Sequence, residues 1–186
     1  MKSETNETKF GKYSLKTLTR DNASKHQISA DSSYVCLLPF EKNGESGIKS
    51  VFLLQFPNSI TGKPEHSLIV DEVDSDTDSN TYESVRRALT EEAGLNLDEL
   101  RIDENKIFYL GEITTTFPAI SNMTCYGIDL TGLGQDGIEF TRNLSKDVFI
   151  REQSSIIKAG FHQIINGDYS DATILSGAFL LVSYFS

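Results

Sequence analysis

The sequence predicts an α/β fold in which helices flank a sheet, an α/β/α arrangement. Short apolar runs bounded by turn residues predict strands at 34–38, 51–54, 67–70, 107–110, 124–128 and 148–150. A helix is predicted over about 80–93, because apolar residues recur at i, i+3, i+4 and i+8 from Val85. Asn80 or Thr81 can cap the start of this helix, and Gly94 can end it.

Two further helices are predicted to close the chain. The first carries the apolar residues Ile156, Ile157, Phe161, Ile164 and Ile165. The second is expected to start behind a cap at Asp171. The uncharged stretch 172–186 is shorter than the roughly 20 residues that a membrane-spanning helix needs, so a buried helix is the better interpretation.

The 186 residues fit one domain of ordinary size. Residues 1–9 are polar and are expected to form a loose tail. We expect residues 1–32 to form an N-terminal tail and leading strand region, and residues 33–186 to form the main domain. No repeat or signal peptide is found.

The charge and the cysteine content limit the classes of function and the compartment that fit this chain. A formal net charge of −10 argues against nonspecific nucleic-acid binding, which needs clustered lysine and arginine. A phosphate ligand would need a divalent cation or a local basic pocket to offset the repulsion. Cys36 and Cys125 lie in apolar runs and are interpreted as reduced core residues of a cytoplasmic protein. No nucleic-acid or membrane partner is expected.

Residues 87–95 read Arg-Ala-Leu-Thr-Glu-Glu-Ala-Gly-Leu. This stretch resembles the second half of a Nudix box, whose pattern is Gly, five residues, Glu, seven residues, then Arg-Glu-apolar-x-Glu-Glu-x-Gly-apolar. Ala88 occupies the position of the first Glu after Arg, Ser79 that of the upstream Glu, and Val73 that of the opening Gly. The family's Pro-Ala-Gly loop before the box falls on residues 71–73. The box is therefore degenerate.

Other segments support the resemblance, which extends from about residue 33 to 184. Residues 51–56 end in Gln55 and an aromatic residue, as in the ADP-ribose pyrophosphatase-like branch of the Nudix superfamily. Residues 109–113 resemble that branch's Leu-Gly strand, and residues 167–173 resemble the entry into its last helix. The resemblance implies a Nudix α/β/α sandwich with a mixed central sheet. It also implies a possible homodimer.

The resemblance further implies a set of site residues. Glu91 and Glu92 are the candidate metal ligands and, with Glu139 of a late loop, the candidate catalytic residues; Asp136 is the alternative for Glu139. Gln55 and Glu112 are the candidate substrate-binding residues. The cofactor of an active enzyme would be Mg²⁺ or Mn²⁺, which neutralises phosphate and activates water. For Glu91 we favour a structural role in an ion-pair ladder with Glu83 and Arg87, whereas for Glu92 both roles stay open.

Three functions follow from a Nudix box that lacks two carboxylates. The first is a domain in which hydrolysis is weak or lost, and which binds a nucleoside-diphosphate-type ligand or a protein partner. The second is an active Mg²⁺-dependent hydrolase of a nucleoside diphosphate linked to another moiety, such as ADP-ribose. The third is a structural or assembly protein with a vestigial pocket. We favour the first function over the second, because Ser79 and Ala88 stand where the box has glutamates and Mg²⁺ binding depends on a few well-placed carboxylates.

Overall fold

A computed structural model describes most of the chain. The described backbone comprises residues 4–10, 13–20, 23–30, 33–44, 47–58, 60–73, 80–95, 97–98, 100, 102–115, 121–133, 155–169 and 171–186. Side chains are described within these ranges from residue 33 onward, except at position 121. The predicted strand at 148–150, Ser79, Asp136 and Glu139 lie outside the described residues.

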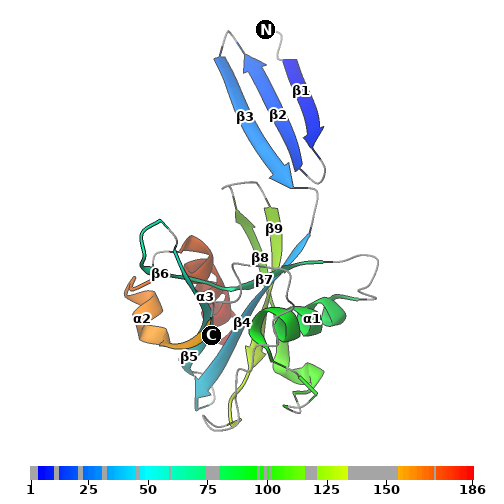
Figure 1. The fold of residues 1–186 in the computed structure, drawn as a ribbon. Helices are drawn as coiled ribbons and strands as arrows, with labels where there is room; N and C mark the ends of the chain where they lie inside the picture. The colour runs from blue at the N-terminus through cyan, green and yellow to red at the C-terminus, as the bar shows by residue number, and fades with distance from the viewer. Residues whose placement is uncertain are drawn as a thin grey trace.

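Two separate sheets are formed (Figure 1). The first contains three antiparallel strands, β1 (Glu4–Phe10), β2 (Tyr13–Arg20) and β3 (Ala23–Ala30). The expectation of a loose tail at residues 1–9 is therefore wrong from Glu4 onward. All seven residues of β1 are in register with β2, and this hairpin-type pairing gives the polar segment hydrogen-bond partners.

The second sheet has seven strands and forms the centre of the main domain. Its main path runs β10-β5-β4-β9-β8, with β6 paired to β5 and β7 paired to β4. The strands are β4 (Tyr34–Asn43), β5 (Gly47–Pro57), β6 (Pro64–Ser67), β7 (Ile69–Glu72), β8 (Ile107–Thr115), β9 (Ser121–Asp129) and β10 (Ser155–Gly160). Strands β4 and β9 are parallel and the other pairs are antiparallel, so the predicted mixed sheet is confirmed.

Helices cover both faces of this sheet. These are α1 (Thr81–Ala93), α2 (Phe161–Ile165) and α3 (Ala172–Phe185), with a short 3₁₀ helix η1 (Glu104–Lys106) before β8. Figure 1 shows α1 on one side of β4 and α2 and α3 on the other. None of the helices in the described part of the chain is long and apolar enough to cross a membrane.

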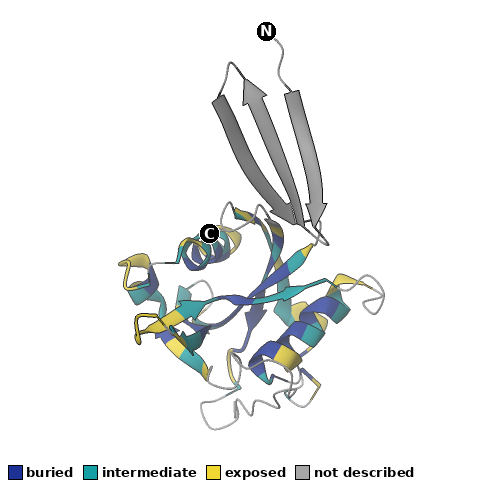
Figure 2. Ribbon diagram, turned by 45° about the horizontal axis from the view of Figure 1, so that its top comes forward, coloured by how far each residue is buried: buried dark blue, intermediate teal, exposed yellow. Residues whose placement is uncertain are grey.

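Strand β4 supplies both hydrophobic cores, because its side chains alternate between the two faces. Val35 and Leu37 pack in the core that contains α1, whereas Leu38 and Phe40 pack in the core that contains α2 and α3. Figure 2 shows the buried residues concentrated on the central strands and on the sheet-facing sides of the helices. Cys36 and Cys125 are both fully buried in the second core, in register across β4 and β9.

Helix α1 begins and ends where the sequence predicts. The Asn80 side chain accepts a hydrogen bond from the Glu83 N–H at 3.0 Å. Gly94 has φ 66° and its N–H bonds Thr90 O at 3.1 Å, which is the pattern of an αL cap, and Leu95 N–H bonds Leu89 O at 2.9 Å. Leu95 is buried and packs in the same core as Leu89.

The segment predicted as one helix from Ile156 to Ile165 divides at Gly160. Its first half is β10, in which Ile156 and Ile157 pair with Leu54 and Leu53 of β5. Only the second half is helical, as α2. The spacing of the isoleucines fits a helix, but β-branched residues also favour strands, and β5 offers an edge that satisfies the backbone of β10.

Helix α3 starts at the predicted cap. Asp171 accepts hydrogen bonds from the N–H groups of Thr173 at 2.6 Å and Ile174 at 3.4 Å. At its other end, Lys42 Nζ lies 4.3 Å from the centroid of the Phe185 ring and 3.2 Å from Asp129 Oδ2. Lys42 therefore places a cation near the negative end of the helix dipole.

Candidate functional site

Three residues spaced by four lie on the buried side of α1: Ser84, Ala88 and Glu92. Such residues lie above one another on a helix. Ser84 and Ala88 are fully buried, and Glu92 is 4% exposed, with Oε1 shielded from solvent. Ala88 packs in the same hydrophobic core as Val35 and Leu37. The position at which the box pattern has its first Glu after Arg is thus a core position here.

Arg87 connects α1 to β7. Its guanidinium forms an ion pair with Asp71 and donates from Nη2 to the Glu72 carbonyl oxygen at 2.6 Å. It also lies 3.8 Å from the Glu91 carboxylate, one turn further along the helix. Glu91 is 57% exposed, which agrees with the interpretation of Glu91 as part of a surface ion pair. The Glu83 end of the predicted ladder stays a prediction.

The described side chains of α1 do not by themselves complete a Mg²⁺ site. Mg²⁺ prefers carboxylate oxygens in octahedral geometry. Ala88 offers no oxygen, and Glu91 is paired with Arg87 on the helix surface. No group of three or more acidic, histidine or cysteine side chains in the described part of the chain is placed to hold a metal ion. The metal-ligand roles of Glu91 and Glu92 therefore stay predictions.

The predicted substrate residues are far apart in the sheet. Gln55 lies on β5 and Glu112 on β8, and β4 and β9 separate these strands in the main path. Three strand spacings amount to about 14 Å. Gln55 is half-buried and its amide nitrogen lies 3.0 Å from His66 Nε2, whereas Glu112 is exposed. The structure does not bring the two together, and their substrate roles also stay predictions.

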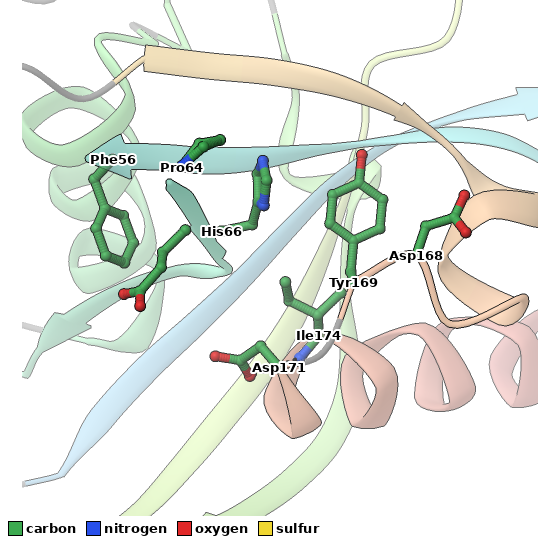
Figure 3. A pocket seen from close by; sticks show the side chains of 8 residues that line it. Phe56, Pro64, His66, Asp168, Tyr169, Asp171 and Ile174 are labelled. Carbon is green, nitrogen blue, oxygen red and sulfur yellow. Dashed lines mark hydrogen bonds between the residues drawn. The ribbon is translucent and has the colours of Figure 1, made fainter. Parts of the chain in front are cut away.

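A cavity of about 400 Å³ lies beside Gln55, on the α3 side of the sheet. Phe56 of β5, His66 of β6 and Tyr169 of the loop before α3 form its aromatic walls (Figure 3). The His66 and Tyr169 rings meet edge to face, with centroids 4.9 Å apart. Ile174 forms part of the apolar lining. The sequence gives no sign of this cavity, because its walls come from three distant segments.

The charge of this cavity is negative. Glu65, Asp168 and Asp171 contribute carboxylates, and the lining residues that the structure describes include no lysine or arginine. An unneutralised diphosphate would be repelled there. The cavity is also not lined by Glu91 or Glu92. The described lining thus offers a diphosphate no basic counter-charge.

Burial changes the titration of two cavity residues. It lowers the pKa of His66, so the ring is neutral at pH 7. With the Gln55 amide nitrogen as donor, His66 Nε2 is the acceptor, which requires the neutral ring. Burial, together with the charge of Asp168, raises the pKa of Tyr169 and keeps its hydroxyl protonated.

Comparison with solved structures settles the fold. An ADP compounds hydrolase matches with a TM-score of 0.59 at 13% identity, over 99% of this chain and 94% of that one. The NUDIX domain of NrtR from Shewanella oneidensis, complexed with ADP ribose, matches with a TM-score of 0.53 at 15% identity, over 90% and 94%. The chain has the Nudix fold. No family model and no curated protein sequence matches it.

A third Nudix-like match is the Ap4A hydrolase of C. elegans, with a TM-score of 0.51 at 14% identity, over 82% of this chain and 96% of that one. The match confirms the predicted α/β/α architecture. The expectation that the chain binds no nucleic acid gains no support, since NrtR, of whose chain this one covers 60%, has also been solved with a 27mer DNA. At these identities the likeness extends to the fold of the Nudix domain and no further.

We predict that Arg87 stabilises the Nudix fold through the geometry of its guanidinium. Arg87→Met should lower the free energy of unfolding by about 2 kcal/mol, because the half-buried Asp71 loses its partner. Arg87→Lys should recover only part of that loss, since an ammonium group cannot reproduce the forked contact with Asp71 and Glu72 O. Urea denaturation measures both values.

Arg86→Lys is the matched control for this measurement. Arg86 forms an exposed ion pair with Asp98, so the change should stay within about 0.5 kcal/mol. Equal losses in Arg86→Lys and Arg87→Lys would contradict the role assigned to Arg87.

We also predict a pH dependence that originates at His66. Its folded-state pKa lies below the unfolded value, so its contribution to stability is complete above about pH 6.5 and is lost as the pH falls through the folded-state pKa. Between about pH 7.5 and about pH 5.5, the urea midpoint of the wild type should fall more than that of His66→Phe, which keeps an aromatic ring beside Tyr169. Equal falls in the two proteins would disprove this origin.

Proposed function

We propose that this chain acts by binding, and that its capacity for Nudix hydrolysis is weak or lost. The observation that supports this most directly is the position of Ala88, which is fully buried in the hydrophobic core. Its neighbour one turn on, Glu92, is left as a single carboxylate on that face of α1. One carboxylate is a poor basis for holding the cations that pyrophosphate hydrolysis requires.

The proposed ligand is a nucleoside-diphosphate-type molecule or a protein partner. The small-molecule half is supported by the resemblance of residues 33–184 to ADP-ribose pyrophosphatases and by the NUDIX domain of NrtR, which was solved with ADP ribose. The acidic charge of the chain means that a diphosphate would need a cation or a basic contact to bind.

The alternative is an active hydrolase that uses Mg²⁺ or Mn²⁺ with Glu92, Glu91 and a carboxylate of the late loop such as Glu139. The full chain should be assayed for release of AMP from ADP-ribose with either metal, and for ligand-induced thermal stabilisation. We expect no release above that of Glu92→Gln, and a rise in unfolding temperature of several degrees at a ligand concentration of about 100 times Kd.

Glu104→Gln, on the exposed η1 helix, controls for the loss of one negative charge. Metal-dependent release that survives in Glu104→Gln and disappears in Glu92→Gln would establish the hydrolase instead. If a panel of nucleotides produced neither turnover nor stabilisation, the small-molecule half of the proposal would be wrong.

Restoring the carboxylate at position 88 gives a second prediction. Ala88→Glu places a charge in the core and should lower stability by several kcal/mol. Mg²⁺ should recover part of that loss, because the introduced carboxylate and that of Glu92 would then lie one turn apart on the same face. Thermal unfolding with and without Mg²⁺ measures the effect.

Ala88→Gln has nearly the same size without the charge and should respond little to Mg²⁺. If Mg²⁺ stabilised the two variants equally, the missing carboxylate at position 88 would not be what separates this chain from a metal-binding Nudix helix.

A further inference from the structure

A groove runs between β8 and α3. It consists of two cavities of about 280 and 310 Å³ that share Ile113, Thr114 and Ser176. One cavity extends toward the end of α3 and includes Phe179 and Ser183. The other extends to the start of α3 at Asp171. From Asp171 to Ser183 the groove follows about 18 Å of the helix.

The wall on the sheet side is the edge of β8 and not one of its faces. Residues 112–115 line the two cavities consecutively. Side chains of a strand alternate between faces, so four successive residues can border one groove only along the strand's edge. Strand β8 ends the main path of the sheet and pairs with β9 alone among the described strands. No described strand pairs with the other edge of β8, and at residues 112–114 this edge can offer backbone hydrogen-bonding groups to the groove.

The wall on the helix side combines apolar residues such as Phe179 and Leu180 with serine and threonine. Helix α3 contains no charged residue, and Phe179 and Val182 on its outer surface are 62% and 37% exposed. The helix approaches β8 closely, because a Cβ atom at Gly111 would lie 3.1 Å from Leu180 Cδ2. Phe179 lines the groove and offers an exposed aromatic surface against which an apolar side chain of a ligand can pack.

The charged residues that line the groove are both acidic. Glu112 lies in one cavity and Asp171 in the other, and no lysine or arginine is among the described residues that line them. Asp171 caps α3 through Oδ1, whereas Glu112 is exposed. A partner with basic side chains would complement this charge, whereas a symmetric contact between this groove and the same groove of a second copy would place carboxylates opposite carboxylates.

We propose that this groove binds an extended, basic segment of a partner protein, which adds to β8 as a further strand. The backbone of the segment pairs with the β8 edge, an apolar side chain packs against Phe179, and a lysine or arginine lies near Glu112. This inference rests on one part of the proposed function, namely that the chain binds a protein partner. It does not depend on whether α1 takes part in nucleotide binding.

Three fluorescein-labelled peptides of nine residues test the proposal on the full chain. Valine alternates with lysine in the first, with glutamine in the second and with glutamate in the third. Fluorescence anisotropy should show saturable binding of the lysine peptide and no binding of the glutamate peptide. Among residues 112–114, hydrogen exchange of the amides that face away from β9 should slow in the complex, which an interaction through side chains alone would not cause.

Variants of the chain test whether Glu112 and Phe179 contact the peptide. Glu112→Lys and Phe179→Ser should each weaken binding of the lysine peptide by about tenfold or more. Glu112→Lys should also gain binding of the glutamate peptide, whereas the remote, exposed control Glu104→Lys should leave both affinities unchanged. Circular dichroism confirms that each variant is folded.

The proposal is overturned if the lysine peptide does not bind, if it binds no better than the glutamate peptide, or if Glu112→Lys has no effect. It is also overturned if light scattering shows a dimer that Phe179→Ser converts to a monomer, because a second copy would then fill the groove. These outcomes are separate from the ADP-ribose assays, so failure here leaves the small-molecule half of the proposed function standing.

Discussion

Strand β4 has to bury both of its faces, and the arrangement of the main domain depends on this constraint. Val35 and Leu37 contact the α1 core, and Leu38 and Phe40 contact the core beneath α2 and α3. On its edges β4 pairs with β5, β7 and β9. Because one strand joins both layers, the depth of α1 on the sheet is fixed, and with it the burial of Ala88 and Glu92.

Local chemistry was sufficient to predict most elements of the main domain. Asn80, Gly94 and Asp171 act at helix ends through their own side chain or backbone, so their roles could be recognised from neighbouring residues alone. Strand β10 could not be recognised in this way. The spacing of Ile156 and Ile157 fits a helix. They form a strand because they pair with β5, about 100 residues away in sequence.

The features of the candidate site also fall into two groups: those that neighbouring residues reveal and those that depend on distant segments. The absence of a carboxylate at position 88 was evident from the sequence, because it follows from counting along one helix. The partners of Arg87 on β7, the contact of His66 with Gln55 and Tyr169, and the groove beside β8 each join elements that are distant in sequence. Glu112 illustrates the difference, since its place at the mouth of that groove depends on where α3 packs and not on its own neighbours.

The turn that ends α1 separates what the helix needs for folding from what a metal site would need. Gly94 holds a left-handed conformation, and Leu95 closes the turn onto Leu89 with both a hydrogen bond and a buried side chain. These requirements come from the backbone and hold whether or not the helix serves catalysis. The glycine and the leucine that follow α1 are thus explained by folding alone, and their presence carries no information about whether the helix holds a metal ion.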